Sequence, residues 1–199
     1  MELFVERGFA RTTVPDIAQR AGLTTRTFFR HYADKREVLF AGEDELPEVV
    51  ARVFTQSPNG LSPLEVIVRG LQTVVAPRLE GEHSYLGVRR GIVNSDAGLQ
   101  EREAHKLASL GRAATTGFAG RGLTPLQAAI AASLAVATYD AAFNMWLDAD
   151  GTASFADAVT TSAETLSLVA SWPSIDTGSR RQRRATPKPA TSEPASPLR

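Results

Sequence analysis

The sequence predicts an all-α protein. Apolar residues recur at intervals of three and four along most of the chain, as amphipathic helices require, and no stretch shows the alternation of a strand. Short runs rich in turn-forming residues separate the helical segments. The 199 residues include no cysteine, which excludes disulfide frameworks, thiolate nucleophiles and zinc–cysteine clusters.

The stretch 13–40 has the pattern of two short helices joined by a tight turn. The first helix has a narrow apolar face, formed by Val14, Ile17, Ala18 and Ala21. Thr13 and Asp16 form a variant of the capping box at its start. Gly22 ends it, because glycine enters the left-handed conformation without steric cost. A second helix is expected over residues 25–32.

This second helix has one apolar and one polar face. Phe28 and Tyr32 are spaced for the inward face, and Thr24 is the N-cap candidate. The other face carries hydrogen-bond donors, which are Thr25, Arg26, Thr27, Arg30 and His31. A short helix, a glycine turn and a basic second helix are typical of a helix-turn-helix, whose second helix enters the DNA major groove.

The charge distribution favours DNA binding over a purely structural helical corner. Residues 7–36 hold seven Arg or Lys against two Asp, whereas residues 37–56 hold one Arg against five acidic residues. The basic excess therefore lies on the corner alone, as expected for a surface that faces phosphates.

These residues resemble the DNA-binding domain of TetR-family (tetracycline-repressor-type) transcriptional regulators. The resemblance covers about the first 45 residues and is carried by Gly8, Phe9, Thr12, Thr13, Val14, Ile17, Ala18, Ala21, Gly22, Leu23, Thr24, Thr27, Phe28, Phe29, Arg30, His31, Tyr32, Lys35 and Leu39. It implies a three-helix DNA-binding domain (1–45) and a helical ligand-binding and dimerisation domain (46–172). The first helix is shorter than is usual in the family, so we expect a truncated start or a start upstream of Met1.

The resemblance also implies which residues touch DNA. Thr24 would cap the recognition helix and touch phosphate, while Thr25 and Arg26 would reach base edges. Arg26 is suited to the bidentate contact with guanine.

Further DNA contacts are implied along the same helix and just after it. Thr27, His31 and Lys35 occupy phosphate-contact positions. Phe29 stands where the family usually has tyrosine, so a phosphate-bonding hydroxyl is missing, and Arg30 is the donor that would compensate.

Residues 34–56 are predicted to form the third helix of the corner and its continuation. Asp34 would cap this helix, and Pro47 would kink or break it. The turn-rich stretch 57–63 is a natural domain boundary. Further helices are predicted over 63–79, 84–95, 96–119, 124–147 and 154–171, with Thr124 and Pro125 as a strong start signal.

The last two helices are predicted to form a homodimer through residues of about 124–171. Small residues allow close helix approach, namely Ala128, Ala129, Ala131, Ala132, Ala135, Ala137, Ala141 and Ala142. A four-helix bundle across a two-fold axis would result, although an alanine-rich helix packed within one chain remains the alternative.

A small-molecule effector pocket is expected among the middle helices. The candidate residues are Tyr85, Arg89, Phe118, Tyr139, Asp140, Phe143, Asn144 and Trp146. Plain core packing is the alternative for the aromatic residues. The Arg89-Arg90 pair would either hold an anionic ligand or form a solvated face.

Other functions have little support in the sequence. The three histidines lack metal-ligand spacing, and phosphate loops and nucleophile elbows are missing, so we expect no catalysis and no cofactor. No apolar run approaches the roughly 18 residues of a membrane span, so we expect a soluble cytoplasmic protein. Residues 173–199, rich in proline and arginine, are predicted to be a disordered tail or, alternatively, a DNA-clinging arm.

The resulting prediction is a ligand-responsive, DNA-binding repressor released from its operator by a small molecule. Ligand binding would move the connecting helix 34–56, with Pro47 as the bend, and separate the recognition helices. The alternatives are an α-helical enzyme or carrier with a structural corner, and a degenerate regulator that binds ligand but not DNA.

Overall fold

Side chains that cap the first turn set where many helices begin. The computed structural model describes residues 1–41, 45–149 and 153–171, and this part of the chain contains helices and no strand. Thr13, Ser62, Thr124 and Ser154 each form a complete capping box, in which side chain and backbone bond reciprocally over three residues. Thr24 and Asp96 cap two further helices. The all-α prediction is confirmed.

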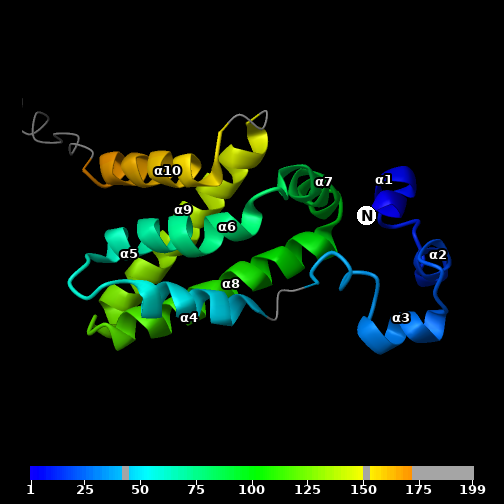
Figure 1. Cartoon of the computed structure of the whole chain (residues 1–199), viewed down its shortest axis with the longest axis horizontal. Helices are drawn as coiled ribbons and strands as arrows, with labels where there is room; N and C mark the ends of the chain where they lie inside the picture. Colours follow the sequence, from blue (N-terminus) through cyan, green and yellow to red (C-terminus); the bar gives the residue numbers. More distant parts are fainter. Residues whose placement is uncertain (42–44, 150–152, 172–199) are drawn as a thin grey trace, which may run out of the picture.

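The helices form two groups (Figure 1). The first group is α1 (Glu2–Arg7), α2 (Val14–Arg20) and α3 (Thr25–His31), which with the segment up to Ala41 we call the head. The second group, which we call the body, contains α4 (Leu46–Gln56), α5 (Pro63–Gly70), the π-helical turn η2 (Leu71–Val75), α6 (Ala76–Leu79), α7 (His83–Asn94), α8 (Ala97–Gly120), α9 (Pro125–Asp148) and α10 (Phe155–Ala170).

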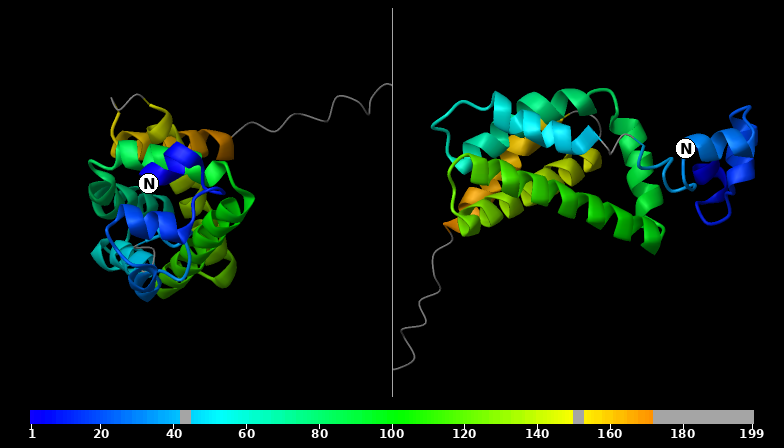
Figure 2. Two further views of the ribbon diagram at one scale, coloured as in Figure 1. Left: turned by 90° about the vertical axis from the view of Figure 1, so that its right-hand side faces the viewer. Right: turned by 90° about the horizontal axis from the view of Figure 1, so that it is seen from below.

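The long helix α8 organises the body, because it packs against α4 on one side and α9 on the other. α10 packs on α9, and the segment from α5 to α6 lies between α4 and α10. The head lies beyond α7 at one end of the molecule (Figure 2). An apolar cluster joins the two groups: Phe4, Phe9, Leu39 and Phe40 of the head pack with Ile92, Val93 and Leu99 of α7 and α8.

The predicted helix from residue 34 to 56 is wrong in its first part. Residues 33–41 form bends and turns, and α4 begins only at Leu46. Asp34 closes a local turn by accepting hydrogen bonds from the backbone N–H of Arg36 (2.7 Å) and from its guanidinium. This guanidinium and the backbone N–H groups hold the pKa of Asp34 below its usual range. Pro47 lies in the first turn of α4, where proline is well tolerated, and therefore makes no kink.

The predicted helix 63–79 is present but contains a π-helical turn. The backbone N–H of Ala76 donates to the carbonyl of Leu71, five residues back, just before Pro77. Gln72, inside this turn, donates from Nε2 to Thr160 Oγ1 (2.9 Å) and to the carbonyl of Ala156 on α10 (3.3 Å). The wide turn is therefore held against the last helix.

The other predicted helices are confirmed to within one or two residues. The proline-rich basic segment 173–199, predicted as a tail, lies outside the described residues.

Candidate functional site: an exposed helix and an internal cavity

α3 is held in place by one buried ring and presents its polar side chains to the surroundings. Phe28 is 3% exposed and packs against Tyr32, with ring centroids 5.4 Å apart. Thr24 caps the helix, because its hydroxyl accepts from the backbone N–H of Thr27 (3.1 Å) and bonds to the Thr27 hydroxyl (2.9 Å). The remaining predicted contact residues of the helix are exposed: Thr25, Arg26, Phe29, Arg30 and His31.

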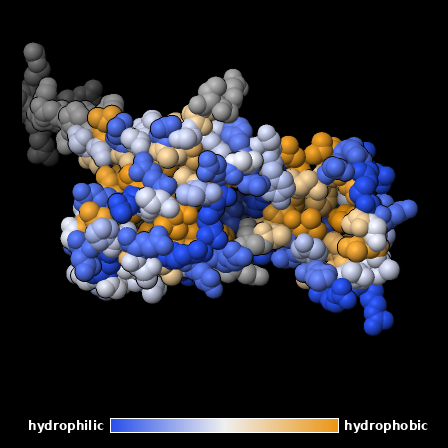
Figure 3. Space-filling view, in the orientation of Figure 1, coloured by the Kyte–Doolittle hydropathy of each residue, from blue (hydrophilic) through white to orange (hydrophobic). Residues whose placement is uncertain are grey.

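The cations of α3 are available to an outside partner. Within the described part of the chain, Arg26 makes no hydrogen bond or ion pair, and Arg30 makes only weak contacts of 3.4 Å with the ring of His31. The lower edge of the head, where α3 lies, is hydrophilic in the space-filling view (Figure 3). Such a face, with donors at successive exposed positions of a capped helix, is suited to a DNA groove.

Lys35 has a different environment from the one expected of a phosphate contact. Its ammonium donates to the carbonyls of Phe9 (2.7 Å), Thr12 (2.9 Å) and Ala10 (3.3 Å), and it lies 4.4 Å from the centre of the Phe9 ring. These contacts use the three donors of the ammonium. The structure therefore assigns the Lys35 side chain to holding the α1–α2 loop.

The short first helix is anchored by contacts that sequence reasoning missed. Arg20 on α2 forms ion pairs with Glu2 and Glu6 on α1, both at 3.0 Å. The Arg20 guanidinium holds the pKa of Glu6 below its usual range. Thr12 is fully buried and donates from its hydroxyl to the carbonyls of Gly8 (2.9 Å) and Leu3 (3.1 Å). The head therefore keeps its packing despite the short α1.

The body contains a cavity of about 340 Å³ that is partly open to solvent. Its wall comes from α4, α5, η2, α6, α7, α8 and α9, and it also includes Leu39 and Ala41 at the end of the head. Five of the predicted pocket residues line it: Tyr85, Arg89, Phe118, Tyr139 and Phe143. Most other lining residues are Leu, Val and Ile, so the cavity is suited to an apolar molecule.

The other three predicted pocket residues lie elsewhere. Asp140 is exposed, and Asn144 donates to its carbonyl (2.9 Å) and carboxylate (3.2 Å) one turn back. Arg90 of α7 donates to the Asn144 side-chain oxygen (3.2 Å), so this polar group braces α7 against α9. Trp146 does not line the cavity but is buried in the apolar cluster behind its wall, edge-on to Phe155 with the ring centroids 5.8 Å apart.

The Arg89-Arg90 pair separates into two environments. Arg90 points to α9 and pairs with Asp148 at 2.6 Å. Arg89 is buried at the cavity, where Nε donates to the carbonyl of Leu39 (2.7 Å) and Nη2 donates to Glu103 (2.9 Å). Its guanidinium also lies 4.7 Å from the centre of the Phe40 ring. Arg89 therefore joins the cavity wall to the end of the head.

Two further cations of the cavity were missed by the sequence reasoning. Arg78 of α6 lines the cavity and pairs with Glu45 at the start of α4 (3.1 Å). Lys106 of α8 also lines it and pairs with Glu103. The available signal was the stripe Leu99, Glu103, Lys106 and Leu110, which places two charges on the inward face of an amphipathic helix.

An apolar stripe on α9 is left exposed in the single chain. Leu126 is 71% exposed and Ile130 52%, and the small residues Ser133, Ala137 and Ala141 continue the stripe to Met145 at helical spacing. By length and composition alone, α9 is long and apolar enough to span a membrane, with a mean hydropathy of 1.3 over 18 residues. The prediction that no apolar run approaches that length is therefore wrong. Only 28% of that stretch is buried within the chain, which leaves room for a partner.

The described residues contain no group of three His, Asp or Glu side chains that would hold a metal ion.

The chain is similar to known regulators in both sequence and fold. Residues 1–41 match the model of the family described as "Bacterial regulatory proteins, tetR family". The HTH-type transcriptional regulator TcmR of Streptomyces glaucescens is 33% identical over 82 residues, which are 41% of this chain and 36% of TcmR. The match thus spans about a third of the length of that relative.

Two solved structures share the fold. FadR of Thermus thermophilus, a TetR-family transcriptional repressor in complex with lauroyl-CoA, superposes with a TM-score of 0.54 at 23% identity over 96% of this chain and 95% of FadR. A candidate TetR-family regulator of Mesorhizobium loti gives a TM-score of 0.50 at 19% identity, covering 85% and 91% of the two chains.

A helix-turn-helix head joined to a helical body defines a DNA-binding transcriptional regulator. The family match of residues 1–41 and the TcmR likeness support a TetR-family regulator.

Proposed function

We propose that the protein is a homodimeric repressor that binds operator DNA through α3 and leaves it when a small molecule fills the cavity. The observation that carries this proposal is a shared wall, because Leu39 and Ala41 line the same cavity as the body helices. A molecule in the cavity would touch the segment that carries the head. Its binding free energy would therefore be coupled to the position of α3.

The relatives support this proposal by analogy of fold. FadR is a repressor in complex with lauroyl-CoA, so a protein of this architecture can bind a ligand that carries a long acyl chain. TcmR is a transcriptional regulator of the helix-turn-helix type. We propose no catalytic activity and no cofactor for the present chain.

At the DNA, Arg26 and Thr25 would reach base edges near the start of α3. Thr24, Thr27, Arg30 and His31 would contact phosphates and fix the register of the helix. Phe29 is exposed but carries no hydroxyl, so its contribution would be apolar contact alone. Lys35 is left out, because its ammonium serves the fold of the head.

A second copy of the chain would cover the exposed stripe of α9 together with Leu168 and Val169 of α10, which are 67% and 65% exposed. Such a dimer is isologous, since the same stripe is buried on both copies. It would present two recognition helices to half-sites about 34–36 Å apart or at multiples of that distance.

The mechanism would not need the bend at Pro47 that the sequence suggested. The segment 33–41 is non-helical, and it reaches the cavity through Leu39 and Ala41. An effector would push directly on this segment and on α4, which supplies Leu46, Val49 and Val53 to the wall. The head would then turn relative to its partner and no longer fit both half-sites.

The test is binding of the purified protein to the DNA upstream of its own gene across a salt series, beside an unrelated duplex. Selective binding that weakens log-linearly with salt is expected. Arg26→Ala should remove selectivity at one base pair, at a cost of about 1–3 kcal/mol. Arg112→Ala, an exposed arginine on α8, is the matched control and should bind like the wild type.

Equal and weak binding of both duplexes by the wild type would contradict the repressor. An Arg26→Ala variant that retains full selectivity would not contradict the DNA-binding regulator, but it would show that another residue contacts the bases.

A further inference from the structure

The described wall of the cavity carries charge of one sign. Its charged members are Arg78, Arg89 and Lys106, all cations, and no acidic side chain lines it among the residues that the structure describes. The remaining wall is apolar apart from two tyrosines, Tyr85 and Tyr139. An apolar cavity with cations is complementary to a molecule that is apolar along most of its length and negative at one point.

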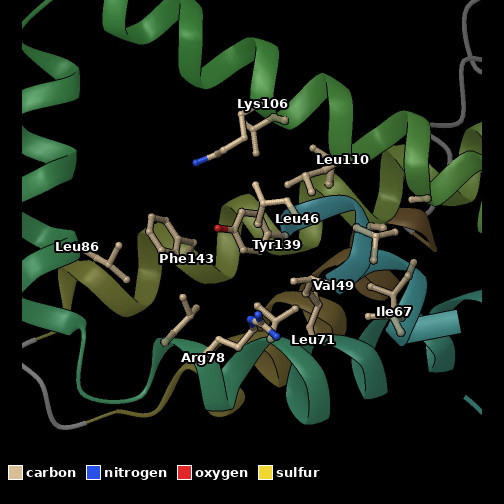
Figure 4. Close-up of a pocket in the computed structure, with 18 of the residues that line it drawn as sticks. Leu46, Val49, Ile67, Leu71, Arg78, Leu86, Lys106, Leu110, Tyr139 and Phe143 are labelled. Atoms are coloured by element: carbon tan, nitrogen blue, oxygen red, sulfur yellow. The ribbon is translucent and has the colours of Figure 1, made fainter. Parts of the chain in front are cut away.

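Two polar side chains face one region of the cavity (Figure 4). The Lys106 ammonium, from α8, and the Tyr139 hydroxyl, from α9, point into the same space. Phe143 borders this space, and Arg78 approaches from the side of α6. The side chains of Val49, Ile67 and Leu71 fill the other end.

A carboxylate of the protein already forms ion pairs with two of these cations. Glu103 is half-buried and pairs with Lys106 and, at 2.9 Å, with Arg89. Burial by itself would raise the pKa of Glu103, but the charges of Lys106 and Arg89 hold it below the usual range, so the group stays ionised. The two cations are therefore arranged to bind an acid group.

We propose that the effector is an amphipathic monoanion, an apolar skeleton with one acid group, and that Lys106 and Arg89 bind this acid group in exchange for Glu103. The inference rests on the proposed function, since it names the ligand class of that same cavity. A neutral molecule of the same skeleton would fill the apolar part but would gain no charge-assisted hydrogen bonds.

Arg89 would connect the acid group of the ligand to the head, because it contacts both the cavity and residues 39–40. Its Nε holds the carbonyl of Leu39 at 2.7 Å, and its guanidinium covers Phe40. Arg102 lies 5.4 Å from the centre of the same ring and pairs with Glu37 at 3.5 Å. A shift of Arg89 toward a ligand acid would weaken its hold on residues 39–40, the end of the head.

The test compares two fluorescent probes that share one skeleton. 8-Anilino-1-naphthalenesulfonate is a monoanion, and N-phenyl-1-naphthylamine is its neutral counterpart. We expect the full chain to bind the anion at least tenfold more tightly than the neutral probe. In Lys106→Met the Kd of the anion should rise about tenfold, while the Kd of the neutral probe stays within twofold.

The neutral probe also reports whether the variant has kept its cavity. Arg112→Met, which removes an exposed cation of the same helix, is the matched control and should leave both Kd values unchanged. Equal affinity of the two probes for the wild type would overturn the inference. So would a Lys106→Met variant that binds the anion as the wild type does, or that weakens both probes alike.

A second readout separates this inference from the proposed function. The anion, and not the neutral probe, should release the wild-type protein from its upstream DNA, and Lys106→Met should need about ten times more of it. Anion-selective binding without any DNA release would support the ligand class and contradict the repressor. Release of the DNA by both probes alike, alongside equal probe affinities, would support the repressor and overturn the ligand class.

Discussion

Arg26 and Lys35 are both basic residues of the head, but their surroundings differ. Arg26 extends from the exposed face of α3, whereas the Lys35 ammonium is held by three carbonyl oxygens of the α1–α2 loop. Counting charge along the chain treats the two alike. The contacts instead predict that Arg26 acts on DNA and that Lys35 acts on stability.

Lys35→Met should therefore destabilise the fold by about 1–3 kcal/mol, because three carbonyls, two of them in partly buried hydrogen bonds, lose their donor. The expected measurement is a lower thermal midpoint, with the salt slope of DNA binding unchanged at a temperature where the variant is folded. Arg30→Met, on the exposed face of α3, should show the opposite pattern of an unchanged midpoint and a smaller slope. A smaller slope with unchanged stability in Lys35→Met would restore the phosphate-contact assignment.

Residues of the cavity were predictable where helical spacing in the sequence placed them on the inward face of a helix. Phe118, Tyr139 and Phe143 lie on inward faces of long helices and do line the cavity. Asp140 and Asn144 were expected there as buried polar groups, but they satisfy each other one turn apart at the surface. Sequence spacing gives the face of a helix, but it does not show which polar groups find partners locally.

At the scale of elements, helix ends were predictable because their signals are local. Asp96, Thr124 and Ser154 each bond a backbone N–H three residues on, and the helices start where the sequence places them. The segment 33–41 was not predictable in this way. Leu39 and Phe40 have helix-like spacing, but their conformation is held by packing against α7 and α8 and by the Arg89–Leu39 bond.

The position of α4 depends on two glycines of neighbouring helices. A Cβ at Gly117 of α8 would overlap the ring of Phe54, and one at Gly70 of α5 would overlap the side chain of Val53. Both glycines have ordinary helical conformations, so their role is close approach. α4 therefore lies nearer to its neighbours than any other residue at these positions would permit.

Gly117→Ala should push α4 outward, at a cost of about 1–3 kcal/mol in the free energy of unfolding. Because α4 lines the cavity, the affinity for the fluorescent anion should change as well. Gly111→Ala on the same helix is the control, since its Cβ would lie 3.5 Å from Val136 in ordinary contact. It should stabilise the protein slightly through helix propensity. Equal effects of the two substitutions in thermal unfolding would show that α4 does not need the glycine.

At the scale of the whole molecule, the head is joined to the body through a small apolar contact beside α7 (Figure 2). Phe40 belongs to this contact, with Arg89 and Arg102 over its ring. A head attached in this way can turn without disturbing the core of the body. The cavity and the contact meet at Arg89, which belongs to both.

The dimer predicted from α9 can be tested by substituting one residue of the stripe with a charged one. Ile130→Glu would place a carboxylate on the exposed stripe and should weaken dimerisation at least tenfold, about 1.4 kcal/mol. Sedimentation would show a shift toward the monomer, with loss of operator binding and little change in helix content. Thr116→Glu, at an exposed site on α8, is the control and should remain dimeric. A dimeric Ile130→Glu variant would place the interface elsewhere.

The π-helical turn at Leu71–Val75 has a consequence for how such a chain can diverge. It holds one residue more than an α-helix needs, and the wide turn absorbs that residue, so deleting one residue there would restore regular winding and leave the helix beyond it facing the same way. Arg78 and Leu79 would therefore still line the cavity. A chain of this kind can gain or lose one residue at this turn and keep the cavity wall that follows it.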